Sequence, residues 1–270
     1  MARMGLDELG LKTMGLENLS TWVINLDRAP ERLARIDEQL QRSGLPYTRL
    51  AAVDARHLSP EQRAELDEPA YRRKHGMSPV LGELGCYLSH VMAMHRFLAT
   101  PAAFALVLED DVLLHAALPA VLQGLLANPR RWDVVKLSAV HSGTPMPYLE
   151  VAPGHQLAVM LSRCTGSSAY LMNRQAATAY AKGLLPMSLP YDHVFDQGWR
   201  FGLQVRLVTP TPCGHDQAIA STIVAPPGVR RKFPWHRRWS AYGYRLGNES
   251  RRLAYGLRET LRETWNQRRG

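Results

Sequence analysis

Ala105-Leu-Val-Leu-Glu-Asp-Asp-Val-Leu-Leu114 is the stretch of this sequence that says most about its fold. Residues 105–108 have the length and composition of a strand buried on both faces, as strands of parallel sheets are. Glu109, Asp110 and Asp111 follow at the C-terminal end of that strand. Ligands of open α/β sheets bind at this end of the strands. The stretch therefore predicts an α/β protein with a binding site at residues 109–111.

The acidic triplet also indicates what kind of ligand it would bind. Three adjacent carboxylates repel one another, and holding them beside apolar packing costs free energy unless a cation or strong donors offset the repulsion. A hard divalent cation, Mg2+ or Mn2+, takes oxygen ligands and is commonly held by one or two carboxylates together with substrate phosphates. The triplet thus indicates a nucleotide-type substrate. A solvated acidic turn is the alternative that the triplet alone leaves open.

The composition is typical of a folded chain in a reducing compartment. With 270 residues and 46% hydrophobic content, the chain can bury a sizeable core in one large domain, or in one domain with an appendage. Its three cysteines are widely spaced and form no CxxC motif, which argues against a disulfide framework. We expect a cytoplasmic protein with neither a signal peptide nor a membrane-spanning helix, because no apolar run approaches about 20 residues.

The net charge of +9 is localised. Residues 228–270, called the basic tail below, hold twelve Arg or Lys and three Glu, whereas residues 1–227 carry equal numbers of basic and acidic side chains. A nucleic-acid enzyme normally carries positive charge around its cleft, so we expect no nucleic-acid partner for the body of the chain.

The basic tail combines arginine with aromatic residues and has leucines at helical spacing, Leu253, Leu257 and Leu261. This pattern predicts an amphipathic helix on an anionic membrane surface, peripheral to the inner face of the cell membrane, where a lipid-linked acceptor is presented. Two alternatives stay open. The helix folds back on the domain through its leucines, or the tail binds nucleic acid.

Predicted strands and helices alternate along the body of the chain. Residues 22–26, an amphipathic helix with Leu33, Ile36 and Leu40 on one face, and residues 47–53 form a β-α-β unit. Further strands are expected at 132–137, 156–164 and 203–208, a strand or turn at 166–172, and helices at 91–98, 116–126 and 174–184. The Gly- and Pro-rich residues 141–154 predict a loop, and residues 1–20 predict a mobile leader.

Short motifs occur in a fixed order over residues 21–225. They are Val23-Ile-Asn-Leu-Asp-Arg28 with Glu31-Arg32, Ala52-Val-Asp54, Gly82-Glu-Leu-Gly-Cys-Tyr-Leu-Ser-His90, Leu108-Glu-Asp-Asp111, Trp132-Asp-Val-Val-Lys-Leu137, Gly166-Ser-Ser-Ala-Tyr170, Pro190-Tyr-Asp192, and Gln217 with Ser221-Thr-Ile223. Together they resemble glycosyltransferase family 25, the lipopolysaccharide-type sugar transferases related to the collagen galactosyltransferases. The order makes the resemblance specific, since each motif alone is weak.

The resemblance implies a GT-A type fold over residues 21–227, a nucleotide-sugar donor, usually UDP-linked, and a divalent metal, Mn2+ or Mg2+, at a DxD-like motif. Glu109 and Asp111 would hold the metal, and His215 is either a further ligand or a surface histidine of a loop. The implied activity is inverting transfer of a sugar, galactose foremost, to a lipopolysaccharide, lipooligosaccharide or other glycan acceptor. A metal-dependent phosphohydrolase shares the acidic triplet and stays as an alternative.

The resemblance also implies roles for single residues. Asp192 would be the general base, with a helix N-cap or a metal or acceptor ligand as alternatives. Arg28 suits a phosphate or base contact, and Asp54 suits the uracil or the ribose unless it is only a turn residue. Lys136 is expected to be buried against a carboxylate, such as one of residues 109–111, whose repulsion it would relieve. The donor-binding set is Asn25, Asp27, Arg28, Asp54, Glu83, Asp110 and Lys136.

Overall fold

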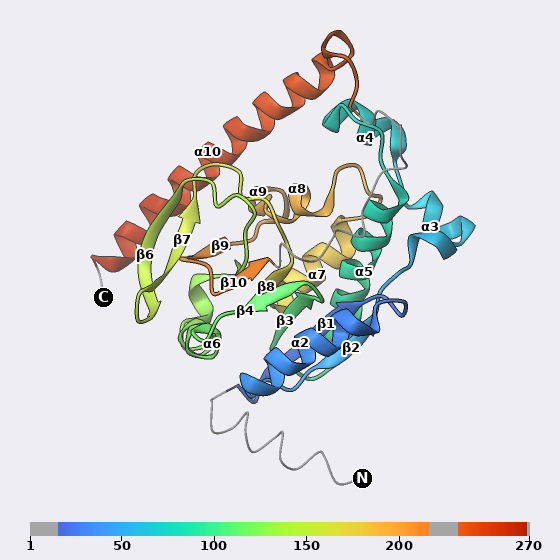
Figure 1. Cartoon of the computed structure of the whole chain (residues 1–270). Helices are drawn as coiled ribbons and strands as arrows, with labels where there is room; N and C mark the ends of the chain where they lie inside the picture. Colours follow the sequence, from blue (N-terminus) through green and yellow to red (C-terminus); the bar gives the residue numbers. More distant parts are fainter. Residues whose placement is uncertain (1–15, 216–231, 269–270) are drawn as a thin grey trace.

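In the computed structural model, which describes residues 16–215 and 232–268, eight strands form a central sheet in the order β2-β1-β3-β8-β5-β9-β7-β6 (Figure 1). They are β1 (Leu19–Asn25), β2 (Thr48–Ala51), β3 (Phe104–Glu109), β5 (Val134–Lys136), β6 (Pro145–Ala152), β7 (His155–Met160), β8 (Ala169–Asn173) and β9 (Val205–Thr209). β7 and β8 run against the other six strands. A small second sheet pairs β4 (Val112–Leu114) with β10 (Cys213–His215).

Helices cover both faces of the central sheet. The α-helices are α2 (Pro30–Arg42), α3 (Pro60–Ala64), α4 (Glu68–His75), α5 (Leu81–Leu98), α6 (Leu118–Leu126), α7 (Arg174–Gly183), α8 (Tyr191–Phe195), α9 (Gly198–Phe201) and α10 (Trp239–Gln267). Short 3-10 helices are η1 (Ala55–His57), η2 (Pro129–Arg131) and η3 (Trp235–Arg237). In β3, Ala105 and Val107 belong to the core under α5 and α7, whereas Leu106 and Leu108 belong to the core under α2 and α6. The predicted burial of this strand on both faces is confirmed.

The predicted β-α-β unit is confirmed and brings its strand ends to one edge. β1 pairs in parallel with β2 on one side and with β3 on the other. Asn25 lies opposite Ala51, and Ile24 lies opposite Glu109. Because parallel strands end at the same edge, the residues that follow β1, β2 and β3 converge on the acidic triplet.

The prediction of a loop at residues 141–154 is wrong, because β6 occupies most of that range and forms an antiparallel hairpin with β7. β6 is the last strand in the sheet order, so Pro145 and Pro147 interrupt no ladder on its open side. The turn of the hairpin contains Gly154 at a φ of 73°, a left-handed conformation that favours glycine.

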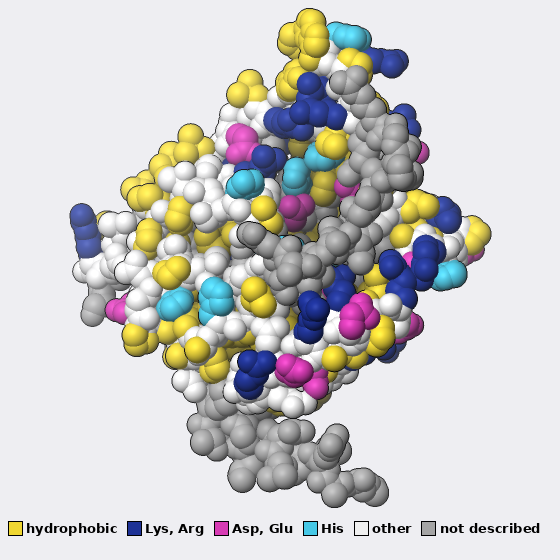
Figure 2. Space-filling model, viewed as in Figure 1, with side chains coloured by type: hydrophobic (Ala, Val, Ile, Leu, Met, Phe, Trp, Pro, Cys, Tyr) yellow, Lys and Arg dark blue, Asp and Glu magenta, His cyan; other side chains and the backbone are white. Residues whose placement is uncertain are grey.

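The helix of the basic tail, α10, packs on the body of the chain, but its leucines do not make the contact. The side of α10 opposite to the leucines is buried instead. The buried residues of α10 are Ala241, Asn248, Arg252, Tyr255, Gly256, Glu259 and Glu263. Leu253, Leu257 and Leu261 point outward instead. Figure 2 accordingly shows hydrophobic side chains along the edge of the molecule where Figure 1 places α10. Within the described residues, no helix is both long and apolar enough to cross a bilayer.

Buried ion pairs attach α10 to the body. Arg252 Nη1 lies 2.6 Å from Asp196 Oδ2, and both side chains are buried. Arg206 Nη2, from β9, lies 2.8 Å from Glu259 Oε2 and 3.0 Å from Glu263 Oε1. Charges buried in this way must stay paired, because an unpaired buried charge is strongly destabilising.

We therefore expect Arg252→Ala to lower the free energy of unfolding by about 3–5 kcal/mol, because it leaves the Asp196 carboxylate buried without its cation. Urea denaturation followed by circular dichroism measures the change. Arg251→Ala is the matched control, since its neighbouring side chain is exposed and should leave stability nearly unchanged. Equal stability of the two variants would show that α10 is not held through this pair.

Candidate active site

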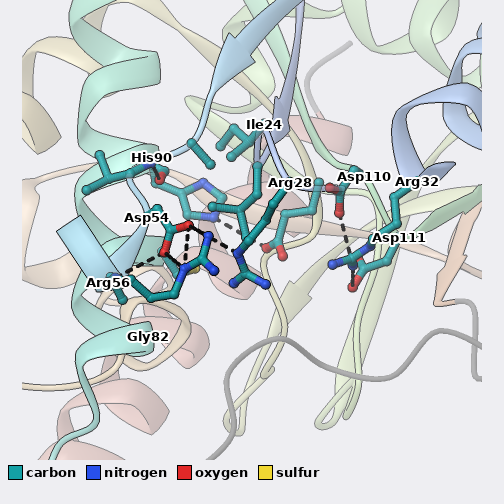
Figure 3. Close-up of a pocket in the computed structure, with 16 residues that line it drawn as sticks. Ile24, Arg28, Arg32, Asp54, Arg56, Gly82, His90, Asp110 and Asp111 are labelled. Carbon is teal, nitrogen blue, oxygen red and sulfur yellow. Dashed lines mark hydrogen bonds and ion pairs between the residues drawn. The ribbon is translucent and has the colours of Figure 1, made fainter. Parts of the chain in front are cut away.

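Two cavities meet at the carboxyl end of β3. The first has a volume of about 340 Å³ and lies between the ends of β1 and β2, the start of α2, and α5 (Figure 3). The second has a volume of about 370 Å³ and lies between residues 166–168, the start of α8, and His215. Cys86, Glu109 and Asp111 line both cavities. A group bound at these three residues is therefore reachable from either side.

Arg32 binds two of the three carboxylates of the acidic triplet. One of its guanidinium nitrogens, Nη2, lies 2.9 Å from Asp110 Oδ1 and 2.8 Å from Asp111 Oδ2. All three side chains are nearly buried, so this cation offsets the repulsion that the sequence predicted. Figure 3 shows Arg32 reaching the two aspartates from α2. In the sequence Arg32 stands in a motif directly after Glu31, and no role was predicted for it.

Lys136 does not offset the repulsion within the acidic triplet. Its prediction as the partner of residues 109–111 is wrong, because its ammonium group donates to the Cys164 carbonyl oxygen at 2.6 Å and lines neither cavity. Asn25 is buried beside the triplet, and its Nδ2 donates to Asp110 Oδ2 at 2.7 Å and to the Ala29 carbonyl oxygen at 3.0 Å. Asn25 and Arg32 together hold Asp110 in place.

Glu109 and Asp111 keep oxygens that can bind a cation. Asp111 Oδ1 is buried and has no hydrogen-bond partner among the described residues. Burial, followed by the charge of Glu109, raises the pKa of Asp111 to about 6. His215 lies on β10, opposite Val112 of β4, and its Nε2 is 3.9 Å from Asp111 Oδ2. Asp111 and His215 thus offer an oxygen and an imidazole nitrogen to a cation such as Mn2+ or Mg2+, with waters or phosphates completing the shell, and Glu109 lines the same cavity.

A second group of possible ligands lies on the other side of Glu109. One ligand atom each from Cys86, His90 and Glu109 falls within 4.8 Å of the others. His90 Nε2 is 3.3 Å from Glu109 Oε1, and its Nδ1 is 2.9 Å from the Tyr170 hydroxyl. Cys86 and His90 stand together in one sequence motif, but no role was predicted for either residue. The signal available was their spacing of four residues, which puts both on one face of α5.

α5 can approach the strand ends because Gly85 has no side chain. A Cβ at Gly85 would lie 2.6 Å from the Val53 carbonyl oxygen. Ser89, one turn later, accepts a hydrogen bond from the Val53 backbone N–H at 2.8 Å. These contacts bring Cys86 and His90 beside the acidic triplet.

Two arginines and Asp54 form the mouth of the first cavity (Figure 3). Arg28 Nε lies 3.1 Å and Arg56 Nη2 lies 2.6 Å from Asp54 Oδ2. The Arg56 hydrogen bonds hold the pKa of Asp54 well below its usual range. Asp54 also accepts from the Arg56 backbone N–H, so its interpretation as a turn residue is confirmed alongside its place in the cavity. Arg56 lies outside the sequence motifs, and no role was predicted for it.

Besides Lys136 and Asn25, two residues of the predicted donor-binding set do not line the first cavity. Asp27 is exposed, pairs with Arg49, and lines neither of the two cavities. Glu83 lines the second cavity rather than the first, and its Oε2 accepts from the Tyr71 hydroxyl at 2.7 Å. The side chains of Asp27 and Glu83 point in other directions than those of Arg28 and Asp54, and the sequence alone does not reveal these directions.

Asp192 lines the second cavity together with Glu109 and Asp111. Its Oδ2 accepts a hydrogen bond from the Gly166 backbone N–H at 3.3 Å. The N-cap of α8 is Pro190, so the alternative that Asp192 is the N-cap is wrong. Tyr191 stacks on the His90 ring, with the ring centroids 4.1 Å apart, and thereby fixes the start of α8 against α5.

A sequence model of glycosyltransferase family 25 (LPS biosynthesis protein) matches residues 18–195. The chain belongs to this family. A glycosyltransferase 25 family member of Aedes aegypti is 30% identical over 129 residues, which are 45% of this chain and 21% of that protein. Procollagen galactosyltransferase 1 of Danio rerio is 27% identical over 152 residues, which are 53% of this chain and 25% of that protein.

An inactive glycosyltransferase 25 family member 3 of Mus musculus is 30% identical over 135 residues, which are 47% of this chain and 22% of that protein. The chain thus spans about a fifth to a quarter of the length of these relatives. Because one of them is named inactive, membership of family 25 does not by itself establish activity.

The matched range of family 25 contains the acidic triplet and Asp192, whereas His215 and α10 lie beyond it. The last motif of the resemblance, Gln217 with residues 221–223, lies outside the described residues. The predicted leader, residues 1–20, is described only from residue 16 onward.

The raised pKa of Asp111 predicts how this carboxyl group changes the stability of the folded chain with pH. A pKa near 6, above the ordinary value of 3.8, means that the folded state holds this proton more tightly than the unfolded chain does. The stabilisation from the protonated carboxyl is complete below pH 4 and is lost as the pH rises through 6. Without metal, Asp111→Asn should therefore raise the free energy of unfolding at pH 7.5 by about 1–3 kcal/mol.

Urea denaturation in the presence of a chelator, at pH 7.5 and pH 4, tests this expectation. The increase in the free energy of unfolding that Asp111→Asn gives at pH 7.5 should become smaller toward pH 4, where Asp111 of the wild type is itself neutral. An Asp111→Asn protein less stable than wild type at pH 7.5 would contradict it.

Proposed function

We propose that this chain is a metal-dependent glycosyltransferase that uses its sheet edge as GT-A type enzymes do. It transfers a sugar, galactose foremost, from a UDP-sugar to a hydroxyl group of a lipopolysaccharide, lipooligosaccharide or other glycan acceptor, with inversion. The supporting observation is that two cavities share Glu109 and Asp111. One cavity can hold a donor and the other an acceptor, so that the two reacting groups meet at the acidic triplet.

The first cavity suits the nucleoside diphosphate. Arg28 and Arg56 at its mouth can turn toward phosphate oxygens, and guanidinium groups bind phosphate through two parallel hydrogen bonds. Asp54 accepts hydrogen bonds and suits the ribose or the uracil. The procollagen galactosyltransferase name of one relative supports galactose as the transferred sugar.

Glu109 and Asp111, with His215 beside them, would hold the divalent cation. When bound there, Mn2+ or Mg2+ supplies positive charge to the departing diphosphate, which needs no proton donor. Arg32 matters for this step because it keeps Asp110 and Asp111 ionised next to each other while leaving Asp111 Oδ1 open.

Asp192 is placed to act on the acceptor from the second cavity. In this proposal its carboxylate takes the proton of the acceptor hydroxyl as the oxygen bonds to the anomeric carbon and the bond to the diphosphate breaks. The Gly166 N–H holds one carboxylate oxygen of Asp192, which orients the group. Attack from the second cavity on a sugar whose diphosphate lies in the first gives inversion.

A thermal-shift assay tests the donor and metal parts of the proposal. UDP-galactose with Mn2+ should raise the melting temperature of the wild-type chain more than either alone, because a ligand that binds only the folded state stabilises it by mass action. Asp111→Asn should lose this joint effect. Glu38→Gln, an exposed control on α2, should keep it. Equal stabilisation of wild type and Asp111→Asn would refute the metal assignment.

A kinetic assay tests Asp192. Asp192→Asn should lower turnover by about two to four orders of magnitude and leave donor affinity nearly unchanged, because a general base acts in the transfer step. If donor affinity falls equally, Asp192 is a metal or donor ligand. Release of UMP and galactose 1-phosphate from UDP-galactose without any acceptor would instead identify a phosphohydrolase, because that reaction breaks the bond between the two phosphates.

A further inference from the structure

α10 carries an apolar face that is exposed along the length of the helix. Leu246 is 73% exposed and Leu261 is 71% exposed, and Leu253, Leu257 and Trp265 are also exposed. Trp239 at the start of α10 and Trp235 just before it are exposed as well. These residues, called the outer face, are Trp235, Trp239, Leu246, Leu253, Leu257, Leu261 and Trp265. Their spacing puts the six that belong to α10 on the side of the helix away from the body.

The outer face cannot turn inward without breaking the packing of α10. The opposite side of the helix carries Arg252, Glu259 and Glu263, which pair with Asp196 and Arg206 inside the protein. Gly256 packs against β7 so closely that a Cβ there would lie 2.8 Å from the Met160 carbonyl oxygen. A half-turn rotation would bury the leucines and leave buried charges unpaired. The ion pairs therefore hold the apolar face outward.

The charges beside the outer face are positive. Arg251, Arg258 and Arg262 lie along one flank of α10 and are exposed. Of the three glutamates of the helix, Glu259 and Glu263 are buried in ion pairs, and Glu249 lies 3.4 Å from Arg252. Lys232 and Arg237 add positive charge next to Trp235.

The combination of exposed apolar side chains and positive charge indicates which kind of partner binds the outer face. A second copy of the chain would bring two rows of arginines together, which repel each other. From Leu246 to Trp265 the outer face is one helix at the edge of the molecule, as Figure 1 shows, and a lone helix does not enclose a peptide; a hollow lined by Phe233, Pro234 and Trp235 lies at its start. A flat anionic surface with an apolar layer beneath it matches leucines flanked by arginines, with tryptophans toward both ends.

We propose that the outer face of α10 binds the surface of an anionic phospholipid bilayer, with the helix parallel to the membrane plane. The 29 residues of α10 extend about 43 Å, so the contact is long. The leucines enter the boundary between headgroups and acyl chains, the tryptophans lie at headgroup level, and the arginines contact lipid phosphates. Under the proposed function, this contact would hold the enzyme at the inner face of the cell membrane, beside a lipid-linked acceptor.

Deleting the basic tail is not a usable test, because Arg206 and Asp196 would lose their buried partners. Point variants of the full chain are suitable, since the outer residues leave those pairs intact. The probe is sedimentation with vesicles of phosphatidylglycerol and phosphatidylcholine, or of phosphatidylcholine alone. Wild type should pellet with the anionic vesicles at low salt, bind less as salt rises, and stay in solution with phosphatidylcholine alone.

Two triple variants separate the contributions of charge and apolar contact. Arg251→Gln with Arg258→Gln and Arg262→Gln should partition about fivefold more weakly for each arginine removed, or about a hundredfold in all. Leu253→Gln with Leu257→Gln and Leu261→Gln keeps helix propensity and should weaken partitioning by about tenfold or more. Arg42→Gln with Arg130→Gln and Lys182→Gln, which removes three exposed basic residues outside α10, should bind as wild type.

Three outcomes would overturn the proposal. In the first, the wild-type protein stays in solution with anionic vesicles. In the second, the leucine variant pellets with these vesicles as the wild type does. In the third, sedimentation velocity shows that the wild type forms a concentration-dependent dimer and that the leucine variant does not. The vesicle assay contains neither donor nor acceptor, so its failure is distinct from failure of the transferase assignment. Transfer to a small soluble acceptor should be the same for the leucine variant and wild type.

Discussion

The site depends on one cation, Arg32, which binds two adjacent carboxylates at the end of a buried strand. Without it, Asp110 and Asp111 would face each other in a low-dielectric environment and would take up protons. Asp110 is fully occupied by Arg32 and Asn25, whereas Asp111 keeps one buried oxygen without a hydrogen-bond partner among the described residues. The arrangement is costly for the folded state and useful for binding a cation. Functional sites commonly hold such strain, because the surrounding structure stabilises it.

The same logic of paired buried charge joins the C-terminal helix to the second cavity. Arg252 of α10 binds Asp196, which directly follows α8, and Asp196 also accepts from the Cys164 backbone N–H at 3.3 Å. α8 begins with Tyr191 and Asp192, and Tyr191 stacks on His90 beside the triplet. α10 is thus part of the scaffold that positions Asp192, although it lies beyond the range that matches family 25. Its buried polar face and its exposed apolar face have different roles, and the first determines where the second points.

Local patterns in the sequence were sufficient for several features. The strand of residues 105–108 is buried on both faces, the first β-α-β unit is parallel, and the acidic triplet lies at a sheet edge beside a cavity. Other features were missed or mistaken. Arg32, Arg56, Cys86 and His90 reach the site from elements whose side-chain directions depend on tertiary packing. β6 was taken for a loop because its prolines are compatible with an edge strand only when its place in the sheet is known.

The basic tail shows most clearly which features the sequence determines and which features depend on the tertiary structure. The sequence by itself determined that residues 249–261 form a helix with leucines on one side and charges around them, because helical periodicity is a local property. It could not determine which side is buried. Hydrophobicity alone favours burial of the leucines, but Arg206 and Asp196 are already buried in the body and need partners of opposite charge. Only the tertiary structure brings those partners together. Breaking the Arg252 pair and the Arg206 pairs would cost about 3–5 kcal/mol each, which is as large as the gain from burying the three leucines.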